Sequence, residues 1–198
     1  RDGQVTIEGK GLNGSLTPYT DIYARALNVN AGLYANELTT VLGQNDIHVK
    51  DQTVLKVDTI NGQSSTQTAK PDFALDVAQL GGMYAGKIFL VGTEAGLGVR
   101  NAGSINAAEN QLTLNANGDL VNTGNIIANK DQIAIQAHNV ANSGNISSTK
   151  SQIQVDAIDI QNSGLIATSD ELKLNAQVKI NNDTGVMNAG RIDFSAQI

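Results

Sequence analysis

The sequence "NSGNI" (residues 142–146) recurs, with small changes, through the second half of the chain. The related phrases are NAGSI (101–105), NTGNI (122–126), NSGLI (162–166) and, less closely, NAGRI (188–192). The first four phrases begin at intervals of 21, 20 and 20 residues. Self-similarity at a fixed period is typical of stacked structural units, because each unit must present the same surface to its neighbour.

Each phrase is followed by a run in which apolar residues alternate with others, as in Ile153-Gln-Val155-Asp-Ala157. Alternation with period two predicts a β-strand with one buried face. A single apolar residue follows each run, and each repeat therefore supplies three short strands with turns at the Asn and Gly positions. The alternating runs lie at 112–116, 133–137, 153–157 and 172–176.

A repeat of this kind predicts an all-β fold, a β-solenoid in which each coil of about 20 residues pairs its strands with the coils above and below at about 4.8 Å. Equivalent residues then form columns along the axis. An antiparallel sheet with ordinary hairpin turns is the alternative, but hairpins do not require four copies in one register. A left-handed helix of hexapeptides is disfavoured because its six-residue sub-period is absent. The isoleucines expected in one buried column are Ile105, Ile126, Ile146 and Ile166.

Two sets of residues hold one register and are the candidate site residues, with a structural role. We predict that the asparagines pass side-chain amide hydrogen bonds from coil to coil. We predict that the glycines adopt backbone angles closed to other residues at a sharp corner. The asparagines are Asn101, Asn122, Asn142 and Asn162, and the glycines are Gly103, Gly124, Gly144 and Gly164.

The first half carries a less regular pattern. The stretches AGLYANELTTVLG (31–43) and GGMYAGKIFLVGTEAGLGVRNAG (81–103) share a Gly-(Leu/Met)-Tyr-Ala phrase followed by equally spaced apolar residues. We interpret them as equivalent faces of an irregular solenoid. Between them, DTINGQSSTQTAKPD (58–72) is polar and contains Gly and Pro, which predicts a loop or small hairpin projecting from a coil.

The composition argues against several classes of chemistry. The net charge is −6 without a basic run, which argues against nucleic-acid binding. The absence of Cys excludes disulfides and thiolate chemistry, and the two histidines, His48 and His138, are too far apart in sequence to suggest zinc. The closest carboxylate pairs, such as Asp156 and Asp159, recur in no neighbouring coil. We therefore predict that the chain is not an enzyme and has no catalytic, cofactor-binding or metal site.

Two further stretches carry a family resemblance. DIYARALNVNAGLYANELTTVLGQNDI (21–47) and LGGMYAGKIFLVGTEAGLGVRNAG (80–103) resemble the later part of the secretion domain of two-partner-secretion exoproteins. The repeats after Val99 resemble the first repeat array of filamentous haemagglutinins and contact-dependent growth inhibition exoproteins. The resemblance implies a right-handed parallel β-helix. Residues 1–98 would be the C-terminal part of the secretion domain, with an extra-helical loop near 58–72, and 99–198 would be regular haemagglutinin-type repeats.

The same resemblance implies a function. The chain would be a filament (stalk) segment of a large exoprotein, exported through the periplasm and an outer-membrane two-partner-secretion transporter to the surface of a Gram-negative bacterium. It would present a distal effector region in contact-dependent growth inhibition. The alternative is a filamentous haemagglutinin-type adhesin that binds host cells or mediates biofilm formation.

The resemblance and the repeat also suggest partners. The transporter is expected to act through the missing N-terminal part, because the family's Asn-Pro-Asn-Gly secretion motif is not in this sequence. A receptor on a target cell would be contacted by other regions of the exoprotein. The repeat is still in register at Ile192 and Phe194, so an open β edge there is expected to favour end-to-end self-association of the fragment.

Overall fold

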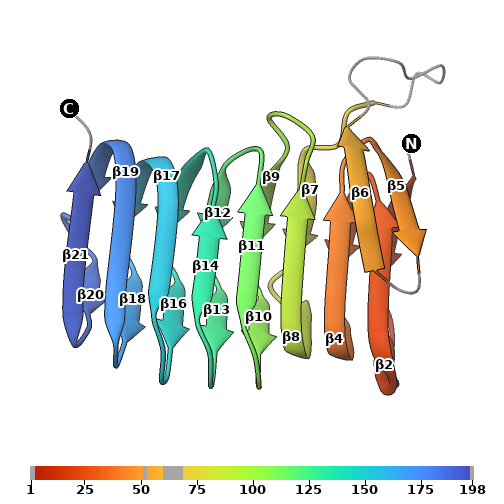
Figure 1. Ribbon diagram of the computed structural model, residues 1–198, viewed down its shortest axis with the longest axis horizontal. Helices are drawn as coiled ribbons and strands as arrows, with labels where there is room; N and C mark the ends of the chain where they lie inside the picture. The colour runs from red at the N-terminus through yellow and green to blue at the C-terminus, as the bar shows by residue number, and fades with distance from the viewer. Residues whose placement is uncertain (1–2, 51–52, 60–68, 197–198) are drawn as a thin grey trace.

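The chain forms a β-solenoid of about eight turns, drawn as a rod in Figure 1 with the first turns at one end and the last at the other. A computed structural model describes residues 3–50, 53–59 and 69–196. Nineteen strands belong to one continuous sheet that winds along the rod. Every regular element in these ranges is a strand, and no helix there could cross a membrane. The predicted all-β parallel β-helix is confirmed.

Three columns of parallel strands form the walls. The first column contains β1 (Gln4–Ile7), β3 (Ala26–Val29), β7 (Phe73–Val77), β9 (Gly98–Asn101), β12 (Leu120–Asn122), β15 (Asn139–Asn142) and the ends of β17 (Ile153–Asn162) and β19 (Glu171–Asn181). The second contains the starts of β2 (Leu12–Ala24), β4 (Gly32–Leu42) and β8 (Gly82–Gly92), then β10 (Ser104–Ala107), β13 (Asn125–Ala128), β16 (Asn145–Ser148), β18 (Leu165–Thr168) and β20 (Val186–Asn188). The third contains the ends of β2, β4 and β8, then β11 (Leu112–Ala116), β14 (Ile133–Gln136), the starts of β17 and β19, and β21 (Arg191–Ala196).

The core is a set of apolar columns inside these walls. In β11 the residues alternate between buried and partly buried, as the period-two pattern predicts. The predicted isoleucine column is also confirmed: Ile105 pairs with Ile126, and the register continues through the next two coils. All four isoleucine side chains are fully buried. Burying each one stabilises the fold by about 1.5–3 kcal/mol relative to leaving it exposed.

The equivalence of the two Tyr-Ala phrases is confirmed by the pairing of β4 with β8. Gly32 lies beside Gly82, and Tyr34 lies beside Tyr84. The match continues to the end of both strands, so the irregular half uses the same three columns as the regular half. The differences between the halves lie in the turns and in one insertion.

The insertion leaves the solenoid earlier than the sequence suggests. β5 (Asn45–Lys50) and β6 (Thr53–Thr59) form a separate antiparallel hairpin, which projects beside the first turns in Figure 1. The chain leaves β4 at Gly43, whose φ of 120° favours glycine. Residues 60–68 of the predicted 58–72 loop lie outside the described residues.

The fifth phrase, NAGRI, is not equivalent to the other four. Asn188 ends β20 and pairs with Ala167 in the second column. The fifth position of the asparagine column is instead taken by Asn182. The turn after Asn182 is also one residue longer than the turn after Asn162, because Val186 is the partner of Leu165.

Candidate functional site

The predicted asparagines form a stack at the turn between the first and second columns. Each Nδ2 donates a hydrogen bond to Oδ1 of the asparagine in the next coil. The bonds run from Asn101 to Asn122 (2.8 Å), Asn122 to Asn142 (2.7 Å), Asn142 to Asn162 (2.7 Å) and Asn162 to Asn182 (2.6 Å). The four predicted members are 0–2% exposed. The stack is therefore a buried polar column inside an otherwise apolar core.

The same Nδ2 groups also tie the two columns together. Asn142 Nδ2 donates to the backbone oxygen of Leu165 at 3.1 Å, at the start of the next coil's second column. Asn122 makes the equivalent bond to Asn145 at 3.2 Å. A buried amide in this position pairs its own polar groups and also a carbonyl oxygen of the turn. Each group left unpaired in the interior would cost about 1–3 kcal/mol, so these hydrogen bonds avoid that cost.

The stack has a definite beginning. In the register of β7 with β9, Val77 occupies the position below Asn101. The Oδ1 atom of Asn101 is consequently buried without a hydrogen-bond partner among the described residues. The column is apolar in the first half of the chain, at Val29 and Val77, and becomes amide from Asn101 onward.

We predict that the cost of removing an asparagine depends on its place in the stack. Asn142→Ala removes an amide bonded on both sides and should lower the free energy of unfolding by about 1–3 kcal/mol. Asn101→Ala should cost less, because its Oδ1 has no donor to lose. Urea unfolding of both variants measures the difference. Equal losses, or wild-type stability of Asn142→Ala, would contradict a stabilising ladder.

The glycine column needs a corrected explanation. The described glycines with φ in the left-handed region are Gly9, Gly11, Gly43 and Gly96, so the column's glycines are not there for backbone angle. They are there because successive turns approach closely. A Cβ on Gly144 would lie 2.1 Å from the backbone oxygen of Gly124, and one on Gly124 would lie equally close to the oxygen of Gly103.

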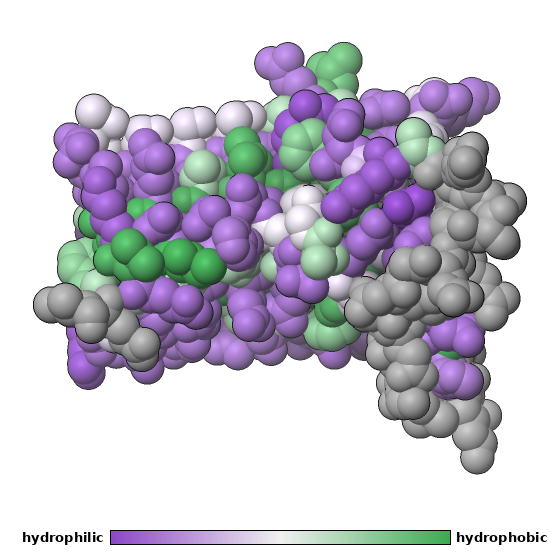
Figure 2. All heavy atoms as spheres, turned by 90° about the horizontal axis from the view of Figure 1, so that it is seen from above, coloured by the Kyte–Doolittle hydropathy of each residue, from purple (hydrophilic) through white to green (hydrophobic). Residues whose placement is uncertain are grey.

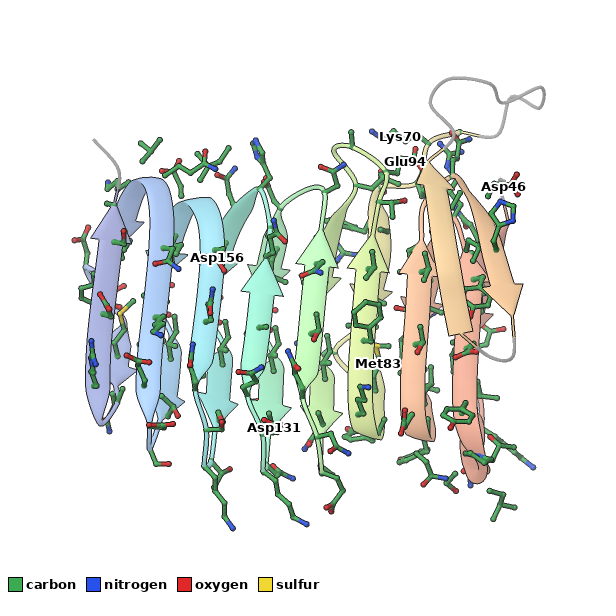
Figure 3. The ribbon with its side chains drawn as sticks, viewed as in Figure 1. Asp46, Lys70, Met83, Glu94, Asp131 and Asp156 are labelled. Atoms are coloured by element: carbon green, nitrogen blue, oxygen red, sulfur yellow. The ribbon has the colours of Figure 1, made fainter. Side chains whose placement is uncertain are left out.

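Charged side chains in the regular half do not converge on a reaction centre. Of the carboxylates labelled in Figure 3, Asp131 and Asp156 belong to the regular half and lie apart, Asp131 near the bottom of the view and Asp156 in β17. Asp156 accepts hydrogen bonds from Gln154 and Asn175, both at 2.8 Å, whereas Asp159 lies in another column of the same strand. Within the described ranges no three His, Cys, Asp or Glu residues are grouped as a metal site would need. Seen from above in Figure 2, the surface is mainly hydrophilic with hydrophobic residues scattered along it.

The first half holds two bidentate ion pairs that sequence reasoning missed. Arg25 binds Glu94 through Nε (3.0 Å) and Nη2 (2.9 Å), and the side chains are only 7% and 14% exposed. Thr93 beside it donates to Asn45 at the base of the hairpin. Partners 69 residues apart in sequence carry no local signal, so only the coil register could have paired them.

The second pair is at the surface. Arg100 binds Asp76 at 2.8 and 2.6 Å, and its guanidinium lies 4.6 Å from the centre of the Phe73 ring. The hydrogen bonds that Arg100 donates to the Asp76 carboxylate raise the pKa of Arg100 above its usual value, and burial together with the nearby Asp21 raises the pKa of Tyr23. Neither shift moves a titrating group toward neutral pH, so neither creates an acid or base for catalysis.

Comparison with known proteins agrees with this architecture. The family model described as the TPS secretion domain matches residues 1–122. Toxin CdiA of Yersinia pestis is 44% identical over 133 residues, which are 67% of this chain and 4% of that protein. The tRNA nuclease CdiA-2 of Burkholderia pseudomallei is 42% identical over 62% of this chain and 4% of its own length. The 16S rRNA endonuclease CdiA of Enterobacter cloacae is 39% identical over 60% of this chain and 3% of its own length. No solved structure matches. The chain thus spans about 4% of the length of the first of these relatives.

Proposed function

The chain belongs to the TPS secretion domain family of two-partner-secretion exoproteins, and on that premise we propose that it is a stalk segment of an exoprotein of contact-dependent growth inhibition. The observation that carries the proposal is the family match over residues 1–122 on a rod of stacked coils. The relatives reported above are named a toxin and two RNA-cleaving nucleases, which favours this function over a haemagglutinin-type adhesin.

The geometry suits export followed by folding outside the cell. Within the columns, strands pair with the coils directly before and after them, so a coil can fold as soon as the preceding coil is in place. No residue is a Cys, so folding needs no disulfide formation. We propose that an outer-membrane two-partner-secretion transporter passes the chain to the surface of a Gram-negative bacterium, where coils add one by one.

Activity against a target cell belongs to other parts of the exoprotein in this proposal. The matched region is only 3–4% of each relative reported above, and their names describe the whole proteins. The described residues of this chain offer a buried amide ladder and separate surface ion pairs, which suit a rigid spacer. We likewise assign the target-cell receptor to a distal region.

Within the chain we propose a division at residue 98. Residues 1–98 would close the secretion domain, and 99–198 would begin the repeats. The start of the amide ladder at Asn101 supports this division, although the family match runs on to Asn122. At the far end Val186, Ile192 and Phe194 are 41–58% exposed. We propose that the isolated chain associates end to end through this apolar surface.

The proposal is tested in a producing bacterium that carries the full-length exoprotein. Gly144→Ala should block stacking of one coil and reduce both surface display and inhibition of target cells several-fold, because a destabilised segment lowers the amount of folded protein. Gly92→Ala, whose Cβ would find ordinary contacts, is the matched control and should behave like the wild type. Normal inhibition by Gly144→Ala despite a misfolded segment would contradict the stalk function. Arrest of growth by residues 1–198 expressed alone in a target bacterium would show an effector instead.

A further inference from the structure

Two tyrosines on the outer face of the second column form an aromatic pair. Tyr34 in β4 and Tyr84 in β8 are register partners, their ring centres are 5.3 Å apart, and the ring planes differ by 18°. The rings remain 47% and 37% exposed as residues. Other large apolar side chains are exposed singly along the rod, but these two tyrosines are stacked on each other and still open to solvent, as in a site that recognises a ligand.

The glycines two positions before the tyrosines leave the space that the rings occupy. A Cβ on Gly32 would lie 2.6 Å from a ring atom of Tyr34, and one on Gly82 would lie 2.4 Å from the corresponding atom of Tyr84. Each ring therefore lies back over a glycine, in space that any other residue would fill.

The tyrosines form one wall of a surface hollow of about 380 Å³. One polar side chain of the lining comes from β4 itself: Asn36 Nδ2 donates to the backbone oxygens of Ser15 and Thr17, both at 2.8 Å. The other polar lining residues come from three other coils. Asn106, the register partner of Tyr84 in the next coil, has a buried Oδ1 without a hydrogen-bond partner in the described part of the chain. The polar residues that line the hollow are Ser15, Asn36, Asn106, Glu109 and Asn129.

The charge pattern indicates which ligands this hollow suits. Glu109 is the one carboxylate in its lining, and that carboxylate already binds Lys130 Nζ at 2.5 Å. A cationic ligand would have to compete with this pair, and an anionic ligand would meet the carboxylate. What is left is an aromatic platform with amide donors and acceptors, which is suited to a neutral molecule that has an apolar face and a hydroxyl-rich edge.

We propose that the Tyr34–Tyr84 hollow binds a neutral saccharide. The C–H face of a sugar ring stacks on the face of the Tyr84 ring that Tyr34 does not cover, and its hydroxyl groups exchange hydrogen bonds with Asn36, Asn106 and Asn129. This binding goes beyond the stalk function and does not depend on it. A sugar-binding site near the base of the stalk would let the rod lie against a glycan-coated surface.

The test measures saturation-transfer NMR and isothermal titration of the chain with maltose, lactose, N,N′-diacetylchitobiose and gentiobiose, with sialyllactose as an anionic comparison. We expect at least one neutral disaccharide to bind with a Kd on the order of 1 mM, the weak range expected for a shallow site. Magnetisation should transfer to the ring C–H protons. Tyr84→Ala should weaken binding at least about tenfold, whereas Tyr84→Phe should retain it within about threefold.

Phe89 provides the matched control. It is 38% exposed, close to the 37% of Tyr84, but it lies in the third column and does not line the hollow. Phe89→Ala should therefore bind as the wild type does. Circular dichroism establishes that each variant is folded. The proposal is overturned if no neutral disaccharide binds, if sialyllactose alone binds, or if Phe89→Ala loses binding as Tyr84→Ala does.

Discussion

Gly144→Ala is expected to destabilise the purified chain by about 3 kcal/mol or more, at the upper end of overpacking effects. The added Cβ would lie 2.1 Å from the backbone oxygen of Gly124 and 2.6 Å from the carbonyl carbon of Thr123. Both atoms belong to the backbone of the coil below, so no side-chain rotation relieves the contact. The coils must separate at this turn, and the Asn122–Asn142 hydrogen bond of 2.7 Å lies beside it.

Gly92→Ala is the control for this substitution. Gly92 is buried, whereas Gly144 is partly exposed, yet a Cβ on Gly92 would lie 3.5 Å from the Ala74 Cβ and 3.8 Å from the next coil, which is ordinary contact. In the third column it lies beside Ala116, so the solenoid already accepts alanine at this register. We expect a change within about 1 kcal/mol, of either sign. Urea unfolding monitored by circular dichroism compares the two variants, and equal destabilisation would refute close turn approach as the reason for glycine.

The regular half was predictable because its columns are visible in the sequence. Four copies of one phrase at nearly constant spacing determine which residues stack, and the structure pairs Ile126 with Ile146 and Asn122 with Asn142 as that spacing requires. The explanation of the glycines was wrong. A sequence pattern indicates that only glycine fits a position, but it does not distinguish a left-handed φ from a neighbouring backbone so close that an added Cβ would lie 2.1 Å from it.

Other features could not be predicted, for identifiable reasons. The excursion into β5 begins just after Gly43, where alternating residues such as Ile47 continue a strand pattern, so the sequence offers no marker of the departure. The fifth ladder residue, Asn182, keeps the spacing of 20 residues from Asn162. It does not match the repeated phrase, because two residues and not one separate it from the following glycine, Gly185. The hollow beside Tyr34 and Tyr84 depends on the turns of several coils, which spacing alone does not place.

The amide ladder and the apolar columns also make different demands on the sequence. Apolar interior positions tolerate exchange among Leu, Ile, Val and Met, as the pairing of Leu33 with Met83 illustrates. An interior amide has both its donor and its acceptor satisfied along the stack only when its neighbours above and below are also amides, and Asn101, with Val77 below it, leaves its Oδ1 unbonded. Such a column propagates its own sequence requirement from coil to coil, which explains why the Asn register is stricter than that of the core residues around it.

The two ion pairs of the first half should differ greatly in their contributions, although both are bidentate. Glu94→Ala removes the carboxylate that Arg25 binds with two hydrogen bonds in a position only 7% exposed. Removing one partner of a buried pair typically costs about 3–5 kcal/mol, because the remaining charge stays in a desolvated site. The loss should also loosen the base of the hairpin, where the neighbouring Thr93 donates to Asn45.

Asp76→Ala is the matched substitution at the surface pair. Arg100 is 49% exposed and its guanidinium can return to water, so the expected loss is about 0–1 kcal/mol. Urea unfolding of both variants is compared in dilute buffer and in about 1 M NaCl, where the Debye length falls to about 3 Å. Salt screens the exposed pair and leaves the buried pair largely unaffected. Hydrogen exchange at Asn45 and Thr93 should rise in Glu94→Ala alone. Comparable losses of free energy of unfolding in the two variants would contradict this prediction. They would mean that other contacts stabilise the Arg25 charge without Glu94, and that the Arg25–Glu94 pair does not anchor the base of the hairpin to the turn after β8.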